Sequence, residues 1–143
     1  MEITRIIAMN EKYELPVNHV PTLRSDTVSR LGEFKRIMVK EVHETDDIIR
    51  EICALQAPDH VDILTMIADL LADIIVYCQS EAVRYGIPLD EVLQIVMDSN
   101  DTKLGADGKP IKDSDGKFLK GPNFVPPEPA IRKLLLEKMN ANN

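Results

Sequence analysis

Apolar residues recur along most of this chain at intervals of three and four, the spacing of one helix face. The spacing predicts a first long helix from Asp26 to about Leu55, followed by a break at Ala57–Pro58. A second helix is predicted from about Val61 to Tyr85, because a glycine and then a proline follow it directly.

Two shorter helices are predicted in the second half of the chain. Asp90 is expected to cap a helix that ends near Ser99 or Asn100, and Pro129 or Ala130 is expected to open a last one over Ile131–Met139. Residues 1–24 contain two prolines and are expected to form an irregular arm that packs on the body.

Composition agrees with a helical protein. Aromatic residues make up 4% of the chain and tryptophan is absent, which favours helices over a β-sandwich or barrel. At 143 residues the simplest interpretation is one domain over residues 1–143. We therefore expect an all-α fold with a four-helix-bundle core, and an ordered loop or short hairpin near the C-terminus.

Charge and hydropathy narrow the choice of partners and compartment. A net charge of -7 argues against a general nucleic-acid surface, and no apolar run is long enough to cross a membrane. Cys53 and Cys78 lie inside helical patterns and are expected to be buried free thiols, which fits a reducing cytoplasm.

A stripe of acid runs along the predicted second helix. Between Ile63 and Cys78 the plainly polar residues are Thr65, Asp69 and Asp73, four positions apart and so on one helical face. A helix that is apolar on its other sides is expected to be buried. Ionised carboxylates there need a cation or hydrogen-bond donors to offset desolvation.

Two glutamates interrupt the inward face of the predicted first helix. Glu41 lies directly on that face, and Glu44 lies on the adjacent row. If the two long helices are antiparallel neighbours, these glutamates and the pair Asp69 and Asp73 can converge. Hard oxygen ligands favour Mg²⁺ or Mn²⁺. The alternative is that the glutamates line a solvent-exposed groove and Asp69 pairs with a basic side chain.

Composition changes after Lys103. Residues 104–128 form a lysine-rich loop with two Asp-Gly turn signals; Ile111 lies between the two turns, and Phe118 and Leu119 follow the second. Asn100 and Lys103, just after the third helix, suit phosphate or base contacts, although the same turn could be only a helix end.

These motifs resemble a known family. Glu41-Val-His-Glu44 followed by Asp69-Leu-Leu-Ala-Asp73 resembles the acidic signature of the all-α nucleoside triphosphate pyrophosphohydrolase superfamily. That superfamily includes MazG-like proteins, dimeric dUTPases and phosphoribosyl-ATP pyrophosphohydrolases. The segment MDSNDTKLGADGKPIKDSDGKFLKGPNFVPP is similar to the tail of phage and bacterial members of its phosphoribosyl-ATP-pyrophosphohydrolase-like group.

The resemblance implies Mg²⁺-dependent attack of water on a nucleoside triphosphate, giving a monophosphate and pyrophosphate. It implies that Glu41, Glu44 and Asp73 are metal ligands, with Asp69 a fourth ligand or the group that orients water. It further implies that a second set of residues holds the nucleotide and its phosphates: Asn100, Lys103, Lys117 and Lys120.

Several points stay open at this level. Stacking on the base would fall to one of four aromatic residues: Tyr77, Tyr85, Phe118 or Phe124. Phosphoribosyl-ATP hydrolysis in histidine synthesis is a second enzymatic interpretation, and a non-catalytic metal-binding bundle is a third. Because the second helix is so apolar, we expect a homodimer or homotetramer built on it.

Overall fold

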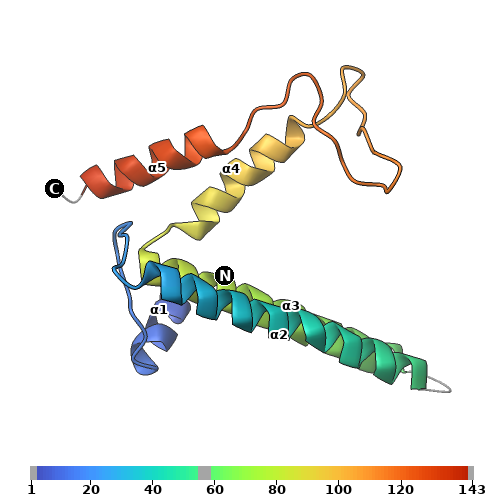
Figure 1. Ribbon diagram of the computed structural model, residues 1–143, viewed down its shortest axis with the longest axis horizontal. Helices are drawn as coiled ribbons and strands as arrows, with labels where there is room; N and C mark the ends of the chain where they lie inside the picture. The colour runs from blue at the N-terminus through green and yellow to red at the C-terminus, as the bar shows by residue number, and fades with distance from the viewer. Residues whose placement is uncertain (1–2, 55–58, 142–143) are drawn as a thin grey trace. The chain divides into compact units, whose positions relative to one another are not determined.

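The computed structural model describes residues 3–54 and 59–141, and over these residues the protein is all-helical (Figure 1). The described part contains no β-strand, and its one isolated antiparallel bridge joins Lys112 to Phe118 in the loop before the last helix. The predicted all-α class and the ordered loop are therefore confirmed. The helices are α1 (Ile3–Lys12), α2 (Thr27–Ala54), α3 (His60–Tyr85), α4 (Leu89–Asp101) and α5 (Glu128–Asn140).

The chain divides into two compact units, Met1–Gly86 and Ile87–Asn143. In the first unit α2 runs along α3, and α1 packs against α3 (Figure 1). In the second unit α4 contacts α5, and the lysine-rich loop connects them. None of the helices in the described ranges has the length and apolar character needed to cross a membrane.

Helix α3 matches its predicted range, and α2 begins one residue after its predicted start. Asp59 caps α3 by accepting a hydrogen bond from the Val61 amide, and Gly86 ends the helix in the left-handed region at φ 65°. Gly86 is also required sterically, because a Cβ there would lie 2.2 Å from the carbonyl oxygen of Val20. The predicted end of the first helix at Leu55 and the break at Ala57–Pro58 lie outside the described residues.

The N-terminal arm differs from its prediction. It packs on the body as expected, but Ile3–Lys12 is a helix and not irregular chain. Its Ile6 is buried, and its Asn10 is fully buried and hydrogen-bonded to Ser80 of α3. The prolines that argued against a helix come after α1, where Asn18 and Thr22 donate hydrogen bonds to the last carbonyls of α3.

Two helix starts and the burial of both thiols also differ from prediction. Pro88 is the N-cap of α4, so Asp90 lies in its first turn and does not cap it. Helix α5 begins at Glu128, just before the predicted start. Both cysteines are free, but Cys53 is exposed and Cys78 is half-buried, so neither is buried as expected.

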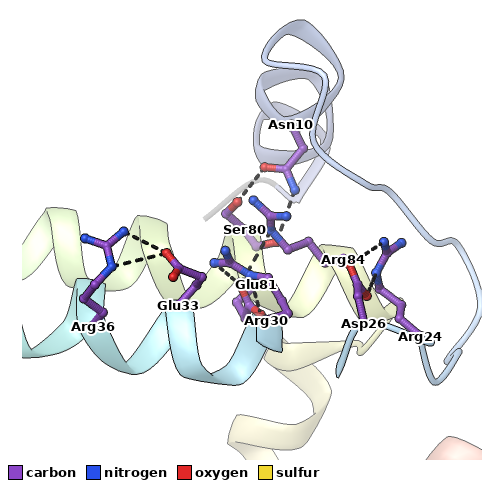
Figure 2. A network of polar contacts seen from close by, with 9 residues as sticks. All are labelled: Asn10, Arg24, Asp26, Arg30, Glu33, Arg36, Ser80, Glu81 and Arg84. Atoms are coloured by element: carbon purple, nitrogen blue, oxygen red, sulfur yellow. Dashed lines mark hydrogen bonds and ion pairs between the residues drawn. The ribbon is translucent and has the colours of Figure 1, made fainter. Parts of the chain in front are cut away.

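Buried ion pairs fasten the first unit where α1, α2 and α3 meet (Figure 2). Arg30 of α2 holds Glu81 of α3 at 2.8 Å, and Arg84 lies 3.5 Å from the same carboxylate. Burial and the neighbouring Arg30 lower the pKa of Arg84. The periodicity of the sequence did not predict this network, because nothing in the spacing of these residues distinguishes them from charged residues on a helix surface.

Candidate functional site

Glu41 lies halfway along α2 and is the one buried residue described for that helix, with 4% of its surface exposed. It lies on the face predicted to point inward, where α2 runs along α3. Apart from the neighbouring Lys40, the described residues provide no recorded cation or hydrogen-bond donor for its carboxylate. Glu41 is therefore a largely buried acid whose charge the surrounding described residues compensate only weakly, which is an unfavourable arrangement.

The electrostatics of Glu41 place two other predicted site residues beside it. Burial is the main cause that raises the pKa of the Glu41 carboxyl, and the carboxylate of Glu44 raises it further. Lys40 opposes this shift, while Asp73 of α3 adds a smaller repulsion. The structure thus brings Glu41, Glu44 and Asp73 into one electrostatic neighbourhood across the two long helices.

The acidic stripe of α3 is not buried within this chain. Asp69 and Asp73 are both exposed and Glu44 is half-buried, so Glu41 is the exception in the set of four. Asp69 has no recorded effect on the pKa of Glu41. The expectation of a fully buried second helix is wrong for the single chain, because only α1 and α2 pack on α3 within the first unit.

The donor set suits a hard divalent cation, although the ligands are not gathered tightly. Across residues 3–54 and 59–141, no three acidic, histidine or cysteine side chains converge closely enough to hold a metal ion. Carboxylate oxygens without thiolate or imidazole are nevertheless the ligands that Mg²⁺ prefers, and Mg²⁺ is commonly held by one or two carboxylates plus water and substrate phosphates. The residues present therefore fit Mg²⁺ by their chemistry.

The predicted nucleotide-binding residues all belong to the second unit. Asn100 and Lys103 lie at the end of α4 and line one pocket of about 370 Å³. Lys117 and Lys120 are exposed in the loop and do not line it. Lys120 lies over the ring of Phe124, with its Nζ 4.5 Å from the ring centroid.

The pocket includes residues that the spacing of charged motifs did not single out. Its remaining walls are Leu104, Pro110, Ile111, Phe118 and Leu119. The sequence did mark three of these, since Ile111, Phe118 and Leu119 are apolar residues within or directly after the segment bounded by the two Asp-Gly turns. Of the four aromatic residues considered for stacking, Phe118 lines this pocket.

The glycine of the KGPN motif has a structural role. A Cβ at Gly121 would lie 2.0 Å from the carbonyl oxygen of Leu104, and the Gly121 amide donates a hydrogen bond to the Lys103 carbonyl at 2.9 Å. The loop therefore returns to touch the end of α4 at a point where only glycine fits. This contact keeps the loop closed around the pocket.

Comparison with known proteins gives a likeness to solved structures. No protein-family model matches the chain, and no curated protein sequence matches it. A solved structure of a candidate NTP pyrophosphohydrolase from Exiguobacterium sp. 255-15 is similar to it with a TM-score of 0.56 and 20% sequence identity. The likeness covers 100% of this chain and 99% of that one. The chain therefore has the same all-α fold as that protein.

Proposed function

We propose that this protein is a Mg²⁺-dependent nucleoside triphosphate pyrophosphohydrolase. It would convert a ribo- or deoxyribonucleoside triphosphate and water to the monophosphate and pyrophosphate. The observation that carries the proposal is the buried Glu41, whose charge Glu44 and Asp73 repel and for which, among the described residues, only the adjacent Lys40 offers compensation. A divalent cation would relieve this repulsion, and the all-α fold supports the same activity by its likeness to a candidate NTP pyrophosphohydrolase.

Each set of residues has a part in the proposed reaction. Mg²⁺, or Mn²⁺ in its place, would be held by Glu41, Glu44 and Asp73, and it would supply neutralisation of phosphate charge and activation of water. Asp69 would be a fourth ligand or would orient the attacking water. Lysine ammonium groups and an amide would bind the nucleotide in the second unit, through Asn100, Lys103, Lys117 and Lys120.

Two physiological roles fit this activity, namely nucleotide-pool sanitation and phage nucleotide metabolism. Phosphoribosyl-ATP hydrolysis is the runner-up within the same chemistry. A non-catalytic metal-binding bundle is the rival from another class. The lysine-rich loop favours an enzyme, because together with Asn100 and Lys103 at the end of α4 it forms a pocket, which a passive bundle does not need.

A panel of canonical and modified nucleoside triphosphates, incubated with Mg²⁺ and resolved by ion exchange, tests the proposal. We expect monophosphate plus pyrophosphate, with turnover abolished by chelation and by Asp73→Asn. Asp62→Asn, in the first turn of the same helix, is the matched control and should retain activity. Absence of turnover with every triphosphate and with phosphoribosyl-ATP would overturn the enzymatic proposal.

We also propose that two copies of the protein associate through α2 and α3. Leu64, Ile67, Leu71 and Ile75 share one face of α3 and are between 38% and 62% exposed. Val28, Leu31, Val42 and Ile49 form a similar exposed stripe on α2. Because α2 and α3 have 28 and 26 residues, a second α2–α3 pair matches this face in length and would complete a four-helix bundle.

Sedimentation velocity at micromolar concentration tests this assembly. We expect a homodimer, or a homotetramer made of two such dimers, and we expect Leu71→Glu to shift the protein toward the monomer. Leu93→Glu on α4 is the matched control, since Leu93 is 49% exposed against 55% for Leu71. A wild-type protein that sediments as a monomer would rule out the association.

A further inference from the structure

The pocket at the end of α4 is asymmetric in its chemistry. Asn100 and Lys103 supply an amide and an ammonium group from the last turn of α4 and the residues just after it. The other walls are apolar and come from the loop, with Phe118 the largest of them and 57% exposed. A ligand that fits this lining has a flat apolar ring, a hydrogen-bonding edge and a negative charge.

The charge around the pocket favours an anion in an otherwise acidic protein. The chain carries a net charge of -7, yet the loop contains four lysines: Lys109, Lys112, Lys117 and Lys120. Lys112 is one of them, with its Nζ 4.9 Å from the centroid of the Phe118 ring. Lys103 itself lines the pocket. Ammonium groups beside an exposed aromatic ring are suited to the phosphate and the base of a nucleotide.

The pocket is formed before any ligand binds, because hydrogen bonds fix the loop that surrounds it. The Leu119 amide donates to the Ile111 carbonyl at 2.8 Å, and the Gly105 amide donates to the Lys109 carbonyl at 2.8 Å. The Asp113 carboxylate accepts hydrogen bonds from the Asp115 and Lys117 amides. A ligand would therefore meet a largely ordered site, which lowers the entropic cost of binding.

We propose that this pocket holds the base of the nucleotide, with Phe118 as the stacking residue. Pro110, Ile111 and Leu119 exclude water around the ring, Asn100 hydrogen-bonds its polar edge and Lys103 contacts the phosphate. The choice of a nucleotide as the ligand rests on the proposed function. The pocket and its lining are independent of that proposal. About 370 Å³ lies within the usual size of a small-molecule site.

Fluorescence of single-tryptophan variants of the full chain tests the assignment, because the natural sequence contains no tryptophan. Phe118→Trp introduces the reporter in the pocket. Phe124→Trp is the matched control, since Phe124 also has a lysine over its ring but does not line the pocket. Each variant is titrated with nucleoside 5′-monophosphates of the common bases and with inorganic pyrophosphate.

Saturable quenching of Phe118→Trp by at least one monophosphate is expected, with none by pyrophosphate, which lacks a base. Phe124→Trp should respond to neither. Calorimetry of Phe118→Ala should then give roughly a tenfold weaker affinity for that monophosphate, because stacking on an aromatic ring carries about this much binding. Equal quenching of both variants, or none in either, would overturn the assignment.

The outcomes separate this inference from the proposed function. Quenching without turnover of any triphosphate would support the base pocket and contradict the hydrolase. Turnover with a KM that Phe118→Ala leaves unchanged would support the hydrolase and contradict the base pocket. Because Phe118 is more than half exposed, its replacement should leave the circular dichroism spectrum and the melting temperature unchanged.

Discussion

Two buried glutamates of the first unit differ in what surrounds them. Glu81 of α3 faces two arginines, with Arg30 at 2.8 Å and Arg84 at 3.5 Å (Figure 2). Glu41 of α2 is at least as buried, but its recorded neighbours include two further acids, Glu44 and Asp73. The same side chain therefore lies in opposite electrostatic settings on one pair of helices.

The difference indicates which carboxylate is structural. A buried charge costs several kcal/mol unless an opposite charge or hydrogen bonds offset it. The charge of Glu81 is offset by arginines of the protein itself, so its carboxylate needs no further partner in the folded chain. Glu41 is offset only weakly, by the adjacent Lys40, so a cation from outside the chain would complete its setting. Replacing each glutamate by glutamine, which keeps the shape and removes the charge, tests this comparison directly.

The largest effect is expected on catalysis, in Glu41→Gln. If Glu41 holds Mg²⁺, turnover of triphosphates should fall by roughly two orders of magnitude or more, measured as kcat/KM from initial rates. Thermal stability without metal should not fall, because the substitution removes repulsion worth at most about 1 kcal/mol between like charges.

Magnesium itself provides the control for this variant. Because Mg²⁺ would bind the folded state and not the unfolded state, adding Mg²⁺ should raise the melting temperature of the wild-type protein. Glu41→Gln should lose most of that rise. A variant that unfolds at lower temperature and still responds to Mg²⁺ like the wild type would show that Glu41 is structural.

The next effect is expected on stability, in Glu81→Gln. Arg30 and Arg84 would then share a buried site without their carboxylate, and breaking such a pair costs about 3 kcal/mol. Urea unfolding followed by circular dichroism should show the loss as a lower midpoint. Mg²⁺-dependent stabilisation should persist, which is the reverse of the pattern for Glu41→Gln.

A double variant separates lost pairing from lost packing at this site. Arg30→Met together with Glu81→Met replaces the charged pair by apolar side chains of similar length. It should recover part of the stability lost in Glu81→Gln, because one of the two arginines is no longer left without its partner. A double variant less stable than Glu81→Gln would show that the attraction between Arg30 and Glu81 stabilises the fold by more than the burial of the two charges costs.

A smaller loss is expected where α1 joins α3. Asn10 is fully buried, and its side chain donates to the Ser80 carbonyl at 3.1 Å and accepts from the Ser80 hydroxyl at 2.7 Å. Asn10→Ala removes both bonds and leaves two buried groups unpaired, so stability should fall by about 1 to 2 kcal/mol. The urea midpoint measures this, and Asn18→Ala, which removes a half-buried bond to Arg84, should cost less.

How far the sequence leads can be seen from the same residues. Spacing placed Glu41 on the inward face of α2 and placed Asp73 on the neighbouring helix, because helical periodicity alone determines which residues share a face. It also located the end of α3, where Gly86 and the proline that follows are local signals. The all-α class followed from the length and number of these patterns.

Partners across the fold could not be predicted in the same way. Nothing near Glu81 in sequence identifies Arg30, which is 51 residues away, and nothing near Asn10 identifies Ser80, 70 residues away. Helix α1 was missed for the same reason, since contacts with α3 stabilise so short a helix. Exposure of Asp69 and Asp73 likewise depends on which elements cover α3, and the composition of α3 does not reveal this.

The smallest effect is expected in Glu33→Gln, which completes the comparison with an exposed glutamate. Arg36 holds Glu33 at 2.8 Å, but the two side chains are 68% and 55% exposed (Figure 2). The hydrogen bond from Arg36 lowers the pKa of Glu33, so any stabilisation is present at neutral pH and is lost as acid protonates the carboxylate. Water and salt screen the pair, so the melting temperature at pH 7 and physiological salt should not change measurably. A clear loss of stability in this variant would mean that an exposed ion pair on α2 contributes to the free energy of unfolding. Desolvation would then not explain the contrast between Glu81 and Glu41.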